Sequence, residues 1–187
     1  MISDHLLAGN EYIIEILERC IKNDRKAQEH LYKKFHGSMW SICMRYIGNT
    51  EEALEVLNDG YLKIFQNLDK YNESLSSPYT WMSRIMINTA IDFIRKKKTL
   101  KFSPVHELQA ENEHTIDDLP DTYTVQELVH FINQLPQTTK LVFNLYVLEG
   151  YTHEEIACFL GITNSTSRWH VTEARKRLRE IIKENGY

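Results

Sequence analysis

Apolar residues recur every three or four positions along most of the chain, and this spacing places side chains on one face of an α-helix. In the first half of the chain the pattern predicts helices over residues 11–21, 25–47, 51–68 and 79–98. After a gap it predicts helices over residues 125–135, 137–149, 152–161 and about 164–182. Because helix-period patterns dominate and glycine and proline are scarce, we predict an all-α protein.

A segment without any sustained period separates the two groups of helices. Residues 100–123 contain two prolines and the acidic residues Glu107, Glu111, Glu113, Asp117, Asp118 and Asp121. Like charges repel one another and extend such a segment, so we expect an acidic, flexible linker. The predicted organisation is a helical domain over residues 1–99, the linker over residues 100–123, and a second small helical domain over residues 124–187.

The second domain ends in the signature of two helices joined by a tight turn. Thr152 and Glu155 have the spacing of a capping box, in which each side chain satisfies a backbone N–H group of the first helical turn. Gly161 allows the left-handed conformation that ends this helix, and Thr163 or Asn164 can cap the next one. This order of signals predicts a helix-turn-helix, whose second helix can enter the major groove of DNA.

The second of these helices has an apolar face and a basic face. The inward positions are Val171, Ala174, Leu178 and Ile181 or Ile182. The outward positions are Arg168, Thr172, Arg175 and Arg179, with Trp169 and His170 near the N-terminal end, which reaches base edges. A DNA-reading helix is the favoured interpretation. The alternative is an ordinary antiparallel helix pair with a solvated basic face, since cations near a helix C-terminus also favour its dipole.

The overall charge limits how such a helix can work. The 187 residues carry a formal net charge of −4, whereas affinity for DNA rests on neutralising phosphates. DNA contact must therefore be local or helped by a partner. In the first domain, the cationic run at residues 95–98 could hold phosphates, and the polar loop at residues 71–78 suits unstacked single-stranded bases. Glu55 and Asp59, one turn apart on one helix face, are consistent with docking of a basic partner.

The sequence shows no signature of catalysis or metal binding. Cys20, Cys43 and Cys158 stand in apolar helical contexts, and we interpret them as buried thiols in a reducing compartment. No Cys/His cluster has zinc spacing, and no glycine loop with a lysine could bind nucleotide phosphates. We assign His153 and His170 to surface or phosphate-contacting positions. We expect no enzyme activity, metal or cofactor, and we expect a cytoplasmic location because neither a signal peptide nor a membrane span is apparent.

Four stretches occur in the order and spacing seen in small bacterial sigma factors. They are DRKAQEHLYKKF, EEALEVLNDGYLKIFQNLDKY, YTWMSRIMINTAIDFIRKKK, and GYTHEEIACFLGI followed by ARKRLRE. They cover about residues 21–182, and on them the chain resembles RNA polymerase sigma factors of the extracytoplasmic-function (ECF) type. The resemblance implies a first domain that binds the clamp coiled coil of core RNA polymerase and opens the promoter −10 element. It also implies a second domain that reads the −35 element as duplex.

The resemblance further implies roles for individual residues. The polymerase-clamp surface corresponds to Glu55, Asn58, Asp59 and Lys63. The surface that opens the −10 element corresponds to Asn72, Ser74, Ser76, Ser77, Tyr79, Trp81, Arg84, Asn88, Asp92, Arg95, Lys96 and Lys97. The surface that reads the −35 element corresponds to Thr166, Arg168, Trp169, Thr172 and Glu173, with Arg175 and Lys176 nearer the DNA backbone.

Three positions of the reading helix depart from the family pattern. A small apolar residue is common where Ser167 stands, a small polar residue where Trp169 stands, and a base where Glu173 stands. These differences bear on the DNA sequence that is read and leave the binding mode unchanged. Trp169 either faces thymine methyl groups and sugars or packs on the preceding helix. Trp81 either anchors the core beneath the loop or contacts a base directly.

The partners implied by the resemblance are core RNA polymerase, through its clamp coiled coil and its flap, and promoter DNA. Family members are often held by a membrane-anchored anti-sigma factor, and we expect a monomer in the free state with no small-molecule substrate. A helix-turn-helix regulator that binds an operator unaided is the competing hypothesis, but it gives the first domain no role. An enzyme acting on nucleic acid ranks third, because no convincing carboxylate cluster or nucleophile occurs.

The acidic linker can be tested directly. In the family this segment threads the RNA path of the polymerase, so its acids are expected to mimic the charge of a nucleic acid. A variant carrying E111Q, E113Q, D117N and D118N should therefore alter initiation and promoter escape in transcription with core polymerase. Unchanged initiation together with unchanged escape would contradict this role.

Overall fold

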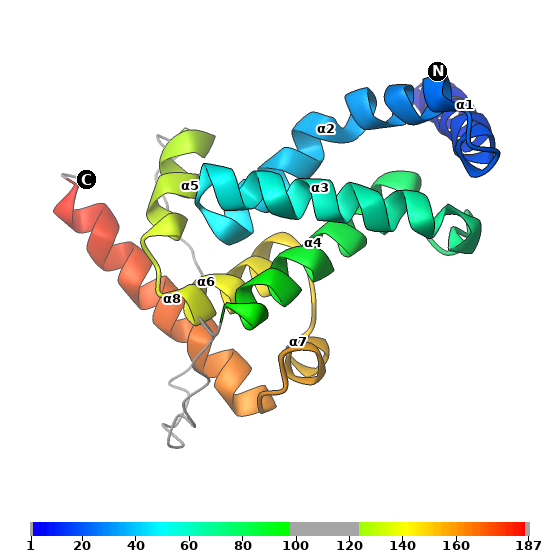
Figure 1. The fold of residues 1–187 in the computed structure, drawn as a ribbon. Coiled ribbons are helices and arrows are strands. Elements are labelled where there is room, and N and C mark those ends of the chain that lie inside the picture. The colour runs from blue at the N-terminus through cyan, green and yellow to red at the C-terminus, as the bar shows by residue number, and fades with distance from the viewer. Residues whose placement is uncertain (1, 98–123, 186–187) are drawn as a thin grey trace. The chain divides into compact units, whose positions relative to one another are not determined.

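The protein is described by a computed structural model that covers residues 2–97 and 124–185 (Figure 1). The chain divides into two compact units, Met1–Lys96 and Lys97–Tyr187, which we call unit 1 and unit 2. Within the described residues both units consist of helices and contain no strand, which confirms the predicted all-α fold class. The predicted linker at residues 100–123 lies outside the described residues.

Unit 1 is built around three helices that pack on one another. They are α2 (Arg25–Ile47), α3 (Thr50–Gln66) and α4 (Pro78–Lys96), and α1 (Ile2–Ile21) packs on α2. A short 3-10 helix, η1 (Leu68–Lys70), leads from α3 into the loop before α4. The largest fully buried side chains of this core are Leu31, Met39, Ile42, Tyr46, Leu57, Ile64, Met82, Met86, Ile87 and Ile91.

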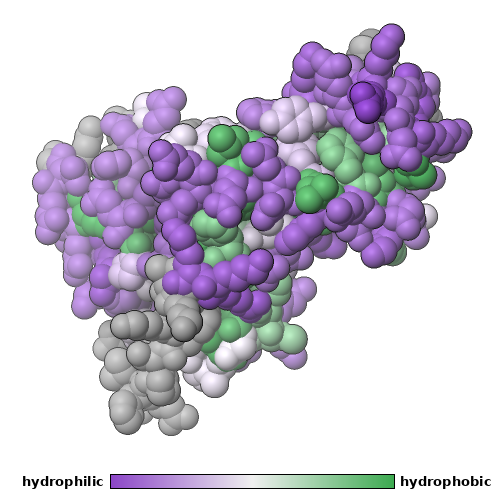
Figure 2. All heavy atoms as spheres, viewed as in Figure 1, coloured by the Kyte–Doolittle hydropathy of each residue, from purple (hydrophilic) through white to green (hydrophobic). Residues whose placement is uncertain are grey.

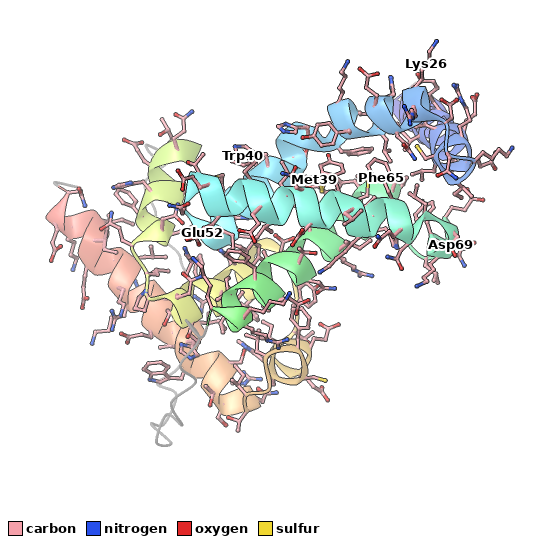
Figure 3. All side chains as sticks on the ribbon, viewed as in Figure 1. Lys26, Met39, Trp40, Glu52, Phe65 and Asp69 are labelled. Carbon is pink, nitrogen blue, oxygen red and sulfur yellow. The ribbon has the colours of Figure 1, made fainter. Side chains whose placement is uncertain are left out.

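Polar side chains at the helix ends fix where the helices of unit 1 begin. Oδ1 of Asp24 accepts hydrogen bonds from the N–H groups of Lys26 and Ala27 at 2.9 and 3.2 Å, which starts α2 as predicted. Lys26 itself points away from the core (Figure 3). The cap of α3 is Asn49, whose Oδ1 accepts from the N–H group of Glu52 at 3.0 Å. The helix predicted from residue 51 therefore begins one residue earlier, at Thr50.

Unit 2 contains four α-helices and one π-helical turn within its described residues. α5 (Val125–Asn133), α6 (Gln137–Phe143) and the π-helical turn η2 (Asn144–Leu148) precede α7 (His153–Leu160) and α8 (Asn164–Glu184). α5, α6 and α7 all pack on α8. The core comprises Phe131, Leu135, Leu141, Val142, Phe143, Leu145, Ile156, Leu160, Val171 and Ala174.

Some residues depart from the burial that their spacing predicts. Ile21 and Leu148 are 48% and 43% exposed, although both follow the apolar spacing of the helices predicted over residues 11–21 and 137–149. Leu148 turns outward because the helix predicted over residues 137–149 widens into the π-helical turn after Phe143. Cys158 is exposed and not buried, because it stands on the outer face of the short helix α7. Cys20 is buried as predicted, and burial raises its pKa to about 11.

Hydrophilic residues cover most of the described surface on the face shown in Figure 2, and the apolar patches between them are small. No helix within residues 2–97 and 124–185 is both long enough and apolar enough to span a membrane.

Gly60 permits a tight contact between α3 and α4. A methyl group built on Gly60 would overlap with Sδ and Cε of Met86, which is fully buried on α4. Protein interiors are close-packed, so a Cβ at position 60 would require the end of the Met86 side chain to move.

Gly60→Ala should therefore destabilise unit 1 by about 1–2 kcal/mol, because the flexible Met86 side chain relieves only part of the overlap. Gly37→Ala is the matched control, since a Cβ on Gly37 in α2 meets nothing within 4 Å. Alanine is favoured over glycine in a helix by about 1 kcal/mol, so this control should raise stability. Urea denaturation followed by circular dichroism measures both changes. A stabilising Gly60→Ala substitution would contradict the packing role of Gly60.

Candidate nucleic-acid and partner interfaces

The exposed face of α3 combines acidic, amide and apolar side chains. Glu55, Asn58 and Asp59 lie on it, and Leu54 and Leu62 beside them are 48% and 56% exposed. These five residues follow the three- and four-residue steps of one helix face, which we call the α3 face. The two leucines were not predicted, because their outward direction depends on which stripe of α3 packs inward. Such a face suits an amphipathic partner with basic side chains.

Lys63, the fourth residue implied for the polymerase surface, is turned toward α4 instead. Its Nζ lies 3.8 Å from Oδ2 of Asp92, and its side chain is 43% exposed. The other carboxylate oxygen of Asp92 lies 3.8 Å from Nη1 of Arg95. Lys63 therefore borders the space between α3 and α4 and not the α3 face.

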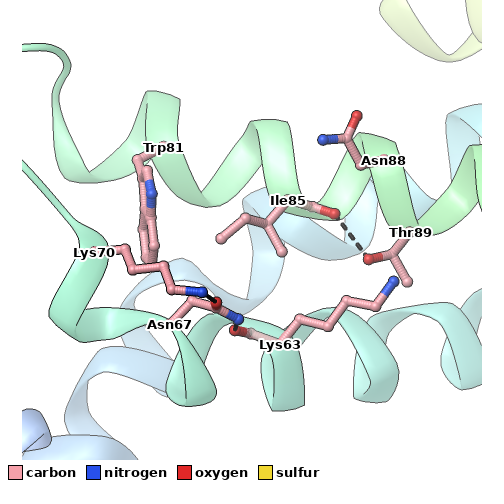
Figure 4. Close-up of a pocket in the computed structure, with 7 residues that line it drawn as sticks. All are labelled: Lys63, Asn67, Lys70, Trp81, Ile85, Asn88 and Thr89. Atoms are coloured by element: carbon pink, nitrogen blue, oxygen red, sulfur yellow. Dashed lines mark hydrogen bonds between the residues drawn. The ribbon is translucent and has the colours of Figure 1, made fainter. Parts of the chain in front are cut away.

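An open groove of about 310 Å³ lies between these two helices (Figure 4). Its lining residues come from α3 and η1 on one side and from α4 on the other: Lys63, Asn67, Lys70, Trp81, Ile85, Asn88 and Thr89. We call it the α3–α4 groove. Of the residues implied for −10 opening, it brings together Trp81 and Asn88. Asn67 and Lys70 were missed, because only the fold places the 3-10 helix against the groove.

Hydrogen bonds hold the polar wall of the α3–α4 groove in place. Nδ2 of Asn67 donates to the carbonyl oxygen of Lys63 at 2.8 Å, and its Oδ1 accepts from Nζ of Lys70 at 2.7 Å. On the opposite side Trp81 is half-buried and meets the ring of Tyr71 edge-on, with ring centroids 5.5 Å apart. The groove thus offers a flat aromatic ring, two amides and two ammonium groups, which suits an unstacked base and its phosphates.

The loop over residues 71–77 joins the two sides of the groove, and it is held by hydrogen bonds. Oδ1 of Asn72 accepts from the N–H group of Ser74 at 2.9 Å. The hydroxyl of Tyr71 donates to the carbonyl oxygen of Ser76 at 3.0 Å. Oγ of Ser77 accepts from the N–H group of Thr80 at 3.1 Å, as a helix cap does. Asn72, Ser74 and Ser77 are exposed, as a contact surface for nucleic acid requires.

The rest of α4 carries the other residues implied for −10 DNA. Arg84 and Asn88 are exposed one turn apart, and Tyr79 is 48% exposed at the start of the helix. The exposed cations Arg95, Lys96 and Lys97 close its C-terminal end.

The helix-turn-helix is formed by α7 and α8 with the predicted caps. Oγ1 of Thr152 accepts from the N–H group of Glu155 at 3.2 Å, and Oε2 of Glu155 accepts from the N–H group of Thr152 at 2.8 Å. Gly161 ends α7 with φ of 68°, in the left-handed region. Of the two candidate caps for α8, Thr163 is the one that forms, because its Oγ1 accepts from the N–H group of Thr166 at 3.0 Å.

His153 and His170 are buried, which corrects their assignment to the surface or to phosphates. Nδ1 of His153 lies 2.9 Å from Oγ of Ser167, and its ring stacks on Tyr146 with centroids 4.2 Å apart. Nδ1 of His170 lies 3.1 Å from Oγ1 of Thr139. Hydrogen bonds are directional, so these contacts orient the first two turns of α8 against α6 and α7. Sequence spacing could not reveal them, because Thr139 and His170 are 31 residues apart.

The exposed side of α8 carries Arg168, Thr172 and Lys176 at four-residue steps. Nε of Arg168 donates to Oδ1 of Asn164 at 3.0 Å, which extends the side chain along the N-terminal turn. Trp169 is half-buried and meets the ring of His170 edge-on at 4.9 Å.

Other residues implied for −35 reading are less exposed. Thr166 is half-buried, and its Oγ1 lies 2.9 Å from Oγ1 of the cap residue Thr163. Glu173 is half-buried and pairs with Arg177. Arg175 is half-buried too, and its Nε atom is shielded from solvent. It was predicted on the outward face, yet it borders an apolar groove of unit 2.

This apolar groove has a volume of about 200 Å³ and lies where α5, η2 and α8 meet. It is lined by Leu128, Phe131, Ile132, Phe143, Val147, Leu148, Leu178 and Ile182, with Arg175 and Arg179 at its edge. We call it the unit 2 groove. It was not predicted, since the exposure of Val147 and Leu148 follows from the π-helical turn.

Comparison with known protein families matches both units. Residues 31–99 match the family described as Sigma-70 region 2, and residues 125–178 match Sigma-70, region 4. The RNA polymerase sigma-H factor of Pseudomonas aeruginosa is 25% identical over 187 residues, covering 91% of this chain and 95% of that protein. The ECF RNA polymerase sigma-E factor of Escherichia coli is 25% identical over 174 residues, covering 87% and 90%.

Two solved structures share the fold. CnrH in complex with the cytosolic domain of CnrY has a TM-score of 0.50 at 13% identity, covering 91% of this chain and 97% of that one. The sigma factor RpoE in complex with the anti-sigma factor NepR, from Bartonella quintana, has a TM-score of 0.51 at 18% identity, covering 83% and 96%.

The helix-turn-helix of unit 2 follows a helical unit with a polar groove, and both sigma-70 regions match in that order, which is the arrangement of a promoter-specificity subunit. The chain belongs to the sigma-70 family of RNA polymerase sigma factors, in its extracytoplasmic-function group. As a sigma factor it acts in promoter-specific initiation of transcription. This confirms the resemblance stated from the sequence.

Burial of His170 makes the stability of unit 2 depend on pH. Burial lowers the pKa of its imidazole from 6.5 to about 4, with Glu173 acting in the opposite sense. The unfolded chain therefore takes up this proton at a higher pH than the folded unit. The contribution of neutral His170 to the free energy of unfolding of unit 2 is complete above about pH 6.5 and is lost as the pH falls toward 4. At pH 5 the free energy of unfolding is lower by about 2 kcal/mol.

Unfolding at pH 7 and at pH 5, followed by the fluorescence of Trp169, should show this loss. Trp40 and Trp81 are replaced by phenylalanine so that Trp169, at 4.9 Å from His170, is the reporter. His170→Gln is the control, because it removes the titrating group and should flatten the pH dependence. An equally steep dependence in that variant would contradict the role of His170.

Proposed function

We propose that unit 1 binds core RNA polymerase and opens the −10 element, while unit 2 reads the −35 element as duplex. The observation that carries this proposal is the α3–α4 groove, in which Trp81, Asn88 and two lysines meet beside an ordered polar loop. A site of this composition suits a single-stranded base, which can stack on an aromatic ring while basic side chains hold its phosphates.

In this proposal one base leaves the promoter duplex and enters the α3–α4 groove. Unstacking and unpairing a base costs a few kcal/mol. Stacking on an aromatic side chain such as Trp81 returns about 1–3 kcal/mol, and Lys63 and Lys70 can hold the adjacent phosphates. Asn88 is placed to accept or donate a hydrogen bond at the base edge. Strand opening then needs no nucleotide hydrolysis.

The α3 face is proposed to dock on the clamp coiled coil of the polymerase. Glu55 and Asp59 provide charge for basic side chains, and Leu54 and Leu62 provide apolar area that a folded monomer leaves uncovered. The unit 2 groove is proposed to receive the polymerase flap. Its apolar lining and the edge cations Arg175 and Arg179 suit an apolar segment with acidic flanks.

The −35 element is proposed to meet the N-terminal half of α8. Arg168 can bond base edges, Thr172 lies one turn further along the same face, and Lys176, one turn beyond Thr172, can contact the DNA backbone. The net charge of −4 makes tight binding of DNA by the free protein unfavourable, so reading depends on the polymerase.

We further propose that the protein is no enzyme and that the polymerase performs all chemistry. It would work in the cytoplasm, where the polymerase is, as a monomer until it binds core enzyme. Since RpoE was solved in complex with the anti-sigma factor NepR, we propose that an anti-sigma factor restrains this chain as well.

Two substitutions separate the proposed roles of the units. Asp59→Ala on the α3 face should weaken binding to core polymerase about tenfold, as loss of an interface anchor does, and should therefore lower transcription from every promoter alike. Arg168→Ala should leave core binding intact but lower −35-dependent transcription by about tenfold or more and relax the preference for bases there. Core binding by fluorescence anisotropy and run-off transcription on −35 variants measure the two effects.

Each substitution has a matched control on the same unit. Asp69→Ala removes an exposed acid of η1 away from the α3 face, and Lys183→Ala removes an exposed cation in the last turn of α8. Both controls should behave like the wild type. The reverse assignment, with Asp59→Ala changing −35 preference and Arg168→Ala weakening core binding, would overturn the division between the units.

A further inference from the structure

The first turn of α8 is tied to the start of α7 by a buried hydrogen bond between two side chains. Ser167 is fully buried, and its Oγ lies 2.9 Å from Nδ1 of His153, which is 8% exposed. Burying a hydroxyl and an imidazole costs free energy that one hydrogen bond barely recovers, and a pair of apolar side chains of similar shape is often as stable. Stability alone therefore does not explain this pair.

The pair joins the two helices of the helix-turn-helix at their N-terminal ends. His153 directly follows the cap residue Thr152, so the capping box of α7 fixes its backbone. The ring of His153 also stacks on Tyr146, with centroids 4.2 Å apart and an angle of 13° between the two planes. Ser167 belongs to the first turn of α8, which begins at Asn164. The imidazole is thus held in place from two sides, and it holds the start of α8 in turn.

A second buried pair acts on the next turn of α8. Nδ1 of His170, three residues after Ser167, lies 3.1 Å from Oγ1 of Thr139 on α6, and both residues are buried. One pair therefore holds α8 to α7, and the other holds α8 to α6. Hydrogen bonds weaken steeply as their geometry changes, so two of them to different helices resist a rotation of α8 about its axis that apolar packing would tolerate.

Rotation of α8 matters because of the residue that stands next to Ser167. Arg168 is exposed, and its Nε donates to Oδ1 of Asn164 at 3.0 Å. The end of a helix side chain lies about 6 Å from the helix axis, so a rotation of about 10° moves it by about 1 Å. Hydrogen bonds to base edges tolerate only about half an ångström. A small change in the rotation of α8 would therefore misplace Arg168 against its base.

We propose that His153 and Ser167 are positioning residues that set the specificity for the −35 element through Arg168, without touching DNA themselves. Their hydrogen bond fixes the rotation of α8, and this rotation decides which base edge the guanidinium of Arg168 meets. Ser167 stands where a small apolar residue is common in the family, so this chain has a directional bond at a position that packing alone could fill. The inference rests on the proposed function, because it requires that α8 reads the −35 duplex.

Three variants separate positioning from stability. Ser167→Ala removes the hydroxyl that faces the imidazole, and His153→Phe keeps an aromatic ring against Tyr146 but removes the nitrogen that faces the hydroxyl. Either change should lower the urea midpoint of unit 2 by about 1 M, as the loss of one partner from a buried hydrogen bond does. The double variant replaces both groups by apolar ones, so much of the lost stability should return. The directional bond is absent from all three variants.

The measurement is run-off transcription by the full-length protein with core RNA polymerase. The probes are the strongest promoter recovered from a library randomised across the −35 element and its single-base derivatives, and the ratio of their rates is the discrimination. All three variants should lower this ratio about fivefold, the scale of one aligned arginine contact to a base, and the double variant should do so although its stability is recovered. Urea unfolding followed by Trp169 fluorescence, with Trp40 and Trp81 replaced by phenylalanine, measures the stability.

Val142→Ala is the matched control. Val142 is fully buried on α6, so this substitution lowers the stability of unit 2 through lost apolar packing and removes no side-chain hydrogen bond. It should lower the urea midpoint as the single variants do and keep the wild-type discrimination. Discrimination that follows stability across these variants, or wild-type discrimination in the double variant, would overturn the inference. If the wild type itself showed no −35 preference with core polymerase, the proposed function would fail, which is a separate outcome.

Discussion

The contact between Gly60 and Met86 is the constraint on which the rest of unit 1 depends. It lets α3 approach α4 closely, because a Cβ at position 60 would overlap with the end of the buried Met86 side chain unless that side chain moved. Gly60 lies one turn before Lys63, and Met86 directly follows Ile85, and both Lys63 and Ile85 line the α3–α4 groove. The spacing of the two helices therefore sets the width of the α3–α4 groove. In the proposed function this width decides whether a base fits against Trp81.

In unit 2, buried polar contacts fix the position of a helix, α8, against its neighbours. Apolar packing alone tolerates rotation of a helix, whereas the pairs His153–Ser167 and Thr139–His170 bond only in one arrangement. They tie the first two turns of α8 to its neighbours, the same turns that present Arg168 to solvent. These buried hydrogen bonds thus fix the direction in which the exposed side of α8 faces. Because the net charge is negative, neither surface alone is expected to bind DNA tightly, and the proposed function uses both units.

Helices and caps could be predicted from the sequence because their causes are local. The spacing of apolar residues, the pair Thr152 and Glu155, and Gly161 each act within one or two turns, and the structure confirms them. Contacts between distant segments could not be predicted. The burial of both histidines, the outward direction of Leu54 and Leu62, and the place of Asn67 in the groove wall all depend on which faces meet. Cys158 was wrongly placed in the core because a helix of eight residues buries only a narrow stripe.

In the proposed function the protein confers promoter choice on a polymerase and does not act on DNA alone. Run-off transcription with core RNA polymerase on a library randomised across both promoter elements is the decisive measurement. We expect transcripts only when the protein is present, from promoters that share two short sequence blocks at a fixed separation, and little binding of those duplexes by the free protein. Tight binding of duplex by the protein alone, with no transcription gained on adding it to core polymerase, would show instead a regulator that acts without the polymerase.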